Sequence, residues 1–252
     1  MDLISQLRRS ILSLSLPPPS PTLLTTLTTS RSPPPPIQSL LATARARLLA
    51  ADLTSSPLVD ASMPAFPPDV DAAHVAEARL ARDVHVQVVD VENLSASRWE
   101  QVEELEAIER GERTRGRQVI RVTEEDELNE ADGASTAGGQ TQASARAATG
   151  GGGGGGQSSG GANAVHRLVL QDRHGKRVYA VELKRVNGIG IGKTSIGEKM
   201  MLRAGAVVAR GTVLLTPENC VLLGGRVDAW HEAWLEGRLA RLRESVGADR
   251  PR

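Results

Sequence analysis

The chain has 252 residues, in which 30 Lys or Arg balance 30 Asp or Glu, so it has room for one or two domains and no net charge that selects a partner. Its single cysteine excludes an intramolecular disulfide, and no apolar run approaches the ~20 residues of a membrane-spanning helix, so we expect no membrane association. Aromatic residues make up only 2% of the chain, so any core must be mainly aliphatic.

Residues 1–62 predict a helical N-terminal region. Leu3, Leu7 and Ile11 recur at four-residue spacing, which indicates a helix over 2–16. An apolar stripe from Ile37 to Leu48 indicates another helix, and a short Thr-rich helix over 21–30 fits between the two proline runs. A proline-rich linker over 63–81 follows, so the barrel domain predicted below spans 82–248.

The first strand is predicted over 82–92. Valines alternate on one face as far as Val88, and the alternation then changes phase at Val89. A phase change inside a strand indicates a β-bulge, which bends the strand as a small barrel requires.

A long insertion over 93–163 separates this strand from the next. Ser97 and Glu100 fit a capping box, which predicts a helix with an apolar stripe of Trp99, Val102, Leu105 and Ile108. Residues 116–122 read as a short extended segment, and the composition from about 124 to 163 predicts disorder. The stripe either meets a partner or packs on the barrel of the same chain.

The remaining strands predict a small barrel. Strands are expected over 165–171 and 177–183 around a turn at 172–175, then over 200–202 and 207–215, with 220–223 as an extension or a short extra strand. A helix over 226–246 closes the chain. The fold class is therefore α+β, mainly β: a five-stranded barrel of the oligonucleotide-binding (OB) type with a long insertion, after a helical region. Tyr179, Val181 and Leu183 are assigned to its interior.

No motif indicates catalysis. Residues 187–194 end in Gly-Lys-Thr like a phosphate-binding loop, but Asn187 stands where that motif needs glycine, and the following residues lead into a strand instead of a helix. The five histidines have no metal-ligand spacing, and Cys220 lies in an apolar run, as a buried hydrophobe does. We expect no enzyme activity, metal or cofactor.

Charge is unevenly distributed along the chain. Residues 165–225 hold ten Lys or Arg and four Asp or Glu, whereas residues 92–130 hold six Arg and twelve acids. A basic barrel supplies the phosphate-neutralising part of nucleic-acid binding, but single-strand binders also stack bases on exposed aromatic rings. A standalone OB nucleic-acid-binding protein, or weak DNA binding by a scaffold, remains the alternative.

An ordered series of residues from 197 to 228 resembles the OB barrel of the RecQ-mediated genome instability protein 1 family. Its members are Gly197, Glu198, Lys199, Leu202 and Gly205, then Arg210, Gly211, Leu214, Leu215, Pro217, Glu218 and Asn219, then Leu223, Gly224, Gly225, Val227 and Asp228. The resemblance implies a non-catalytic nuclear scaffold subunit of a RecQ helicase–topoisomerase III complex. Such a subunit promotes dissolution of double Holliday junctions and suppresses crossovers in DNA replication, homologous recombination and repair, and so supports genome stability.

The resemblance also implies where partners bind. The long loop after the first barrel strand would reach the topoisomerase gate, which assigns Trp99, Val102, Leu105 and Ile108 to partner binding. The family-matching turns and the neighbouring basic strand add Lys184, Arg185, Pro217, Glu218, Asn219, Leu223, Gly224 and Gly225.

Overall fold

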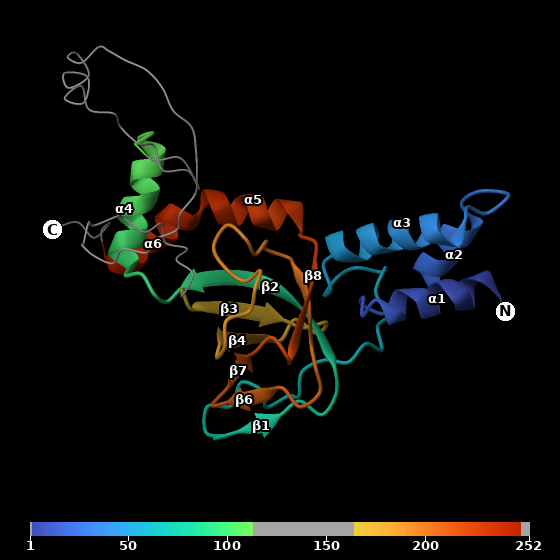
Figure 1. The fold of residues 1–252 in the computed structure, drawn as a ribbon, viewed down its shortest axis with the longest axis horizontal. Helices are drawn as coiled ribbons and strands as arrows, with labels where there is room; N and C mark the ends of the chain where they lie inside the picture. The colour runs from blue at the N-terminus through green and yellow to red at the C-terminus, as the bar shows by residue number, and fades with distance from the viewer. Residues whose placement is uncertain (1, 113–163, 248–252) are drawn as a thin grey trace, which may run out of the picture.

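A computed structural model of the chain describes residues 2–112 and 164–247 (Figure 1). The extended segment predicted over 116–122 and the disorder predicted over 124–163 lie outside the described residues. The described part has two hydrophobic cores, one among the N-terminal helices and one inside a curled sheet. None of its helices combines the length and apolarity needed to cross a membrane.

Three helices form the N-terminal core, as predicted: α1 (Leu3–Ser13), α2 (Pro21–Thr29) and α3 (Ile37–Ala50). The α2 helix begins with proline, and the Ser20 hydroxyl caps it by accepting a hydrogen bond from the Leu23 amide at 3.2 Å. Leucines on the facing sides of the helices are fully buried, so this region packs through an aliphatic core of its own.

The sheet is mixed and curls into an open half-barrel (Figure 1). Its strands are β1 (Ala78–Arg79), β2 (Val84–Asn93), β3 (His166–Gln171), β4 (Arg177–Glu182), β5 (Lys199–Leu202), β6 (Val207–Ala209), β7 (Thr212–Leu215) and β8 (Cys220–Gly224). They lie in the order β1-β6-β7-β4-β3-β2-β5-β8, with only β4 and β7 parallel. The described residues therefore form eight strands, not the predicted five.

One of the three extra strands arises because a single predicted strand is divided in two. Residues 207–215 fold into a hairpin of β6 and β7, because Arg210 and Gly211 have φ values of 47° and 76°. Positive φ at both central residues is what a two-residue hairpin turn requires. The short β1 lies in the segment predicted as a linker, and residues 220–223 belong to the separate strand β8.

The bulge predicted in the first strand is confirmed. The pairing of β2 with β3 shifts between Val88 and Asp90. Before the bulge β2 is buried on both faces: Val84, Val86 and Val88 belong to the sheet core, while the alternating polar side chains approach the helical region.

The predicted interior of β4 is wrong by one residue. Val178 and Ala180 are buried in the core, whereas Tyr179 is 51% exposed and Leu183, just after the strand, is 63% exposed. The outer face of β4 therefore presents Tyr179, Val181 and Leu183 to solvent.

Segments around the sheet complete its core. Phe66, Val70 and Leu80, from the predicted linker, are buried in it. The predicted C-terminal helix is two helices, α5 (Asp228–Glu236) and α6 (Arg238–Val246), which break at Gly237. The insertion begins with α4 (Arg98–Glu109), capped by Ser97 and Glu100 as predicted.

Candidate functional site

Exposed apolar side chains meet where the insertion leaves and rejoins the sheet. Asn93 pairs with His166 and Arg167 pairs with Val181, so Leu94, Val165 and Leu183 follow one another across the ends of β2, β3 and β4. The Leu94 amide donates to the Val165 carbonyl at 2.9 Å. These three side chains are 47%, 38% and 63% exposed. With Lys184 and Glu218 they form what we call the root surface.

The predicted turn 217–219 lies beside this root surface. The Asn219 side chain accepts from the Thr216 amide at 2.9 Å and donates to the Leu214 carbonyl at 2.7 Å, which fixes the turn. Lys184 Nζ lies 3.7 Å from a carboxylate oxygen of Glu218, and both side chains are about two-thirds exposed. Four predicted site positions, Lys184 and the turn residues Pro217, Glu218 and Asn219, therefore lie together, and Asn219 shapes the turn.

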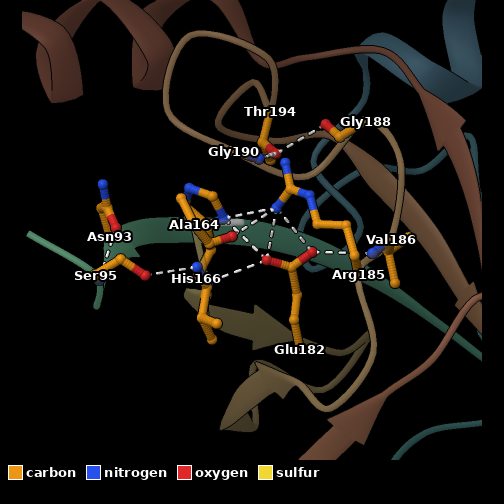
Figure 2. Close-up of polar contacts among 11 residues, drawn as sticks. Asn93, Ser95, Ala164, His166, Glu182, Arg185, Val186, Gly188, Gly190 and Thr194 are labelled. Atoms are coloured by element: carbon orange, nitrogen blue, oxygen red, sulfur yellow. Dashed lines mark hydrogen bonds and ion pairs between the residues drawn. The ribbon is translucent and has the colours of Figure 1, made fainter. Parts of the chain in front are cut away.

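Arg185 points away from this surface into a buried polar network, shown in Figure 2. Its guanidinium donates to both carboxylate oxygens of Glu182, at 3.0 and 3.1 Å, and to the Ala164 carbonyl at 3.0 Å. Glu182 also accepts from the amides of His166 and Val186, each at 3.0 Å. The charge of Arg185 thus compensates a buried carboxylate.

The same network contains a histidine–carboxylate pair. His166 Nδ1 lies 2.9 Å from Glu182 Oε2, while its Nε2 has no hydrogen-bond partner (Figure 2). A catalytic pair of this kind needs a nucleophile within reach of the free nitrogen. The nearby Thr194 hydroxyl instead donates to the Gly188 carbonyl at 3.3 Å and accepts from the Gly190 amide at 3.0 Å. The network fixes loop geometry.

Leu223, on the edge strand β8, and Gly225, just after it, lie against the helical region. Leu223 packs on the helical core. Gly225 has φ of 82°, and a Cβ there would stand 2.4 Å from the Leu49 carbonyl oxygen. Gly224 also has positive φ, with open space around it. This part of the family-like pattern therefore joins the two cores and lies apart from the root surface.

The predicted stripe on α4 is divided between the interior and solvent. Val102 is buried, Leu105 and Ile108 are half-buried, and Trp99 is 55% exposed. The α4 helix packs on α6, to which it is joined by an ion pair between Glu106 and Arg243 at 2.7 Å. Packing on the chain's own structure thus accounts for Val102, and Trp99 is the stripe residue best placed for a partner.

Residues 187–194 have the setting predicted for a structural loop. They run through turns into the strand β5 and do not open a helix. Cys220 is buried as predicted, and burial raises the pKa of its thiol to about 11. Within the described ranges, no cluster of three or more His, Cys, Asp or Glu is placed to hold a metal ion.

Comparison with known proteins gives two family matches in the same order as the two cores. The family described as "RMI1, N-terminal helical domain" matches residues 11–56, and "RMI1, N-terminal OB-fold domain" matches residues 66–238. RecQ-mediated genome instability protein 1 of Schizosaccharomyces pombe is 26% identical over 196 residues, which cover 76% of this chain and 74% of that protein. The half-barrel thus has the OB fold predicted from the sequence.

Proposed function

Because this chain belongs to the RMI1 family, we propose that it is a non-catalytic scaffold subunit of a nuclear RecQ helicase–topoisomerase III complex. In this role it promotes dissolution of double Holliday junctions and suppresses crossovers during DNA repair. The observation that carries the proposal is the family match across both the helical and the OB parts. The name of the fission yeast relative supports the association with a RecQ helicase.

The root surface is the best-supported position for topoisomerase III. It combines three exposed apolar side chains with a charged rim. Protein–protein interfaces commonly have such an apolar centre surrounded by polar residues. It also lies at both ends of the insertion, so a partner bound there would meet the inserted residues. Trp99, a residue type common among binding hot spots, extends from the same insertion.

Support for a scaffold over an enzyme comes from the two features that most resemble catalytic ones. The Gly-Lys-Thr loop leads into β5, so its amides lack the helix N-terminus that binds phosphate. The His166–Glu182 pair is used to hold Arg185 and the start of the next loop.

The test is binding to topoisomerase III from the same organism by isothermal titration calorimetry. Leu183→Asp and Lys184→Glu should each weaken binding about tenfold or more without lowering the melting temperature, since both side chains are exposed. Leu12→Asp, at an exposed leucine on α1, is the matched control. Full affinity in both root-surface variants would remove this assignment. Arg185→Glu is unsuitable, because it would place a second carboxylate beside buried Glu182.

The nucleic-acid alternative gains one observation. Tyr179 is exposed instead of interior, and the Arg167 guanidinium lies 4.9 Å from its ring centroid, so one stacking residue is available on the sheet face. Against it, Arg167 is already paired with Glu92. Fluorescence anisotropy with a labelled thymidine oligonucleotide tests this function. Tight, salt-dependent binding lost in Tyr179→Ala would make DNA a principal ligand.

A further inference from the structure

A cavity of about 500 Å³ opens between the C-terminal helices and the outer face of the sheet. It lies at the bulge of β2, and its lining, which contains none of the root-surface residues, includes Asp90, Val169, Arg177, Tyr179, Trp234 and Arg241. A volume of this size matches sites that enclose one or two side chains or a small ligand.

Trp234 forms a fixed aromatic wall of the cavity. Its indole Nε1 donates to Asp90 Oδ1 at 2.7 Å, and the side chain is nearly buried. Arg238 and Arg241 lie over the ring, at 5.6 and 5.8 Å from its centroid. The ring is therefore held from both α6 and β2 before any ligand arrives, which lowers the entropy cost of binding.

Two arginines and one carboxylate line the cavity, which gives it an excess of positive charge. Arg177 on β4 and Arg241 on α6 are exposed, and neither forms an ion pair within the part of the chain that the structure describes. Two nearby cations already have ion-pair partners: Arg167 is paired with Glu92, and Lys176 is paired with Asp71. The Asp90 carboxylate on the opposite side already accepts from the Trp234 indole and the Val91 amide.

We propose that this cavity binds a short acidic segment of a protein partner. An apolar side chain of the segment packs against Trp234 and Val169, and an adjacent carboxylate is bound by Arg177 and Arg241. Arginine suits this role because its planar donors match a carboxylate in pairs. This site is separate from the proposed topoisomerase surface, and it would let the scaffold hold a second partner.

The charges favour a peptide over single-stranded nucleic acid. A strand would carry successive phosphates past Asp90 and Glu92, which both lie on β2 beside the cavity. Only two arginines line the cavity to offset that repulsion, and of its two aromatic rings only Tyr179 is exposed for stacking. A short peptide carries only one or two carboxylates instead of a phosphate at every position, and its backbone amides can donate to Asp90.

The experiment uses the full chain and fluorescein-labelled peptides read by anisotropy. The probe is a short Gly/Ser peptide with one Phe between two Asp residues, and its matched control has Lys in place of both Asp. We expect the acidic peptide to bind at least about tenfold more tightly than the basic one. Arg177→Glu and Arg241→Glu should each abolish that preference, whereas Arg82→Glu, at an exposed position just before β2, should leave it unchanged.

Equal binding of the two peptides, or no binding of either, would overturn the proposal. So would a thymidine oligonucleotide that binds more tightly than the acidic peptide and depends on Arg177, because the ligand would then be nucleic acid. Topoisomerase binding measured on the same variants should be unchanged, so a failure here is distinct from a failure of the proposed scaffold role.

Discussion

Gln87 on β2 donates a hydrogen bond of 2.7 Å from its side-chain Nε2 to the carboxylate of Asp52, just beyond α3. The same side chain accepts from the Leu53 amide at 2.9 Å and donates to Gln171 on β3 at 3.1 Å. Gln87 is completely buried. One residue of the sheet thus satisfies polar groups from both cores, so the helical and OB parts are joined by specific hydrogen bonds.

Removing this amide should destabilise the whole fold. Gln87→Ala leaves the Leu53 amide and the Gln171 side chain without that partner in a buried setting, which should lower the free energy of unfolding by about 2–4 kcal/mol. Urea denaturation measures the loss. Gln38→Ala makes the same change at an exposed position of α3 and should cost under about 0.5 kcal/mol. Equal stability of the two variants would show that the connection contributes nothing.

Lys199 predicts a pH dependence at the same junction. Its side chain is fully buried, and desolvation lowers the pKa of the ammonium from 10.5 to about 8, partly offset by the charge of Asp52. Between these two values the unfolded chain holds the extra proton, so raising the pH favours the folded state. Stability should therefore rise from pH 8 to 10.5, by roughly 3 kcal/mol if the shift is expressed in full.

The comparison that isolates this effect is with Lys199→Met, which keeps an unbranched side chain, one atom shorter, and removes its charge. Cys220 works in the opposite direction, because its raised pKa makes folding less favourable as the pH passes from 9 to about 11. Both the unmodified chain and Lys199→Met contain Cys220, so its contribution cancels when their free energies of unfolding are subtracted. A difference that stays constant across pH 8 to 10.5 would show that Lys199 does not titrate as described.

The sequence was sufficient for elements with strong periodicity and clear end signals. The three N-terminal helices, the capping box at Ser97 and the bulge near Val88 were all predicted from residue spacing, turn residues and β-branched runs. Each of these features depends on residues that are close together in the sequence. The hairpin at Arg210 was missed because arginine seldom adopts positive φ, so only Gly211 marked the turn.

The candidate site was harder to predict because it depends on tertiary pairing. The larger apolar side chains, Tyr179 on β4 and Leu183 just after it, were assigned to the interior because of their size. The true interior face ends in Glu182, whose burial is made possible by Arg185 and His166. A charged residue on a buried face can be recognised only when its partners are known. The root surface and the Trp234 cavity both follow from this reversal.

The contact between α4 and α6 should set the direction in which the insertion leaves the OB domain. Arg243→Glu places a carboxylate beside Glu106 and should increase amide hydrogen exchange over α4, while global stability falls by only about 1 kcal/mol because both groups are partly exposed. Glu106→Arg combined with Arg243→Glu restores opposite charges and should restore protection. Failure of this reversal to recover protection would assign the docking to Val102 alone.

The last prediction concerns the inserted residues themselves. Residues 113–163 can be replaced by a short Gly/Ser linker while α4 is kept, because α4 packs on α6 and its Val102 is buried. Shortening a loop changes its closure entropy by only ~0.6 kcal/mol per halving, so the barrel should fold with nearly unchanged stability. Binding to topoisomerase III through the root surface should persist, but the stimulation of decatenation by the helicase–topoisomerase complex should fall severalfold.

A chain of equal length with residues 113–163 in scrambled order separates the effect of sequence from that of tether length, since a plain tether would keep its activity after scrambling. Full stimulation by the shortened chain would show that residues 113–163 only connect α4 to β3, and that the scaffold acts through its folded surfaces alone.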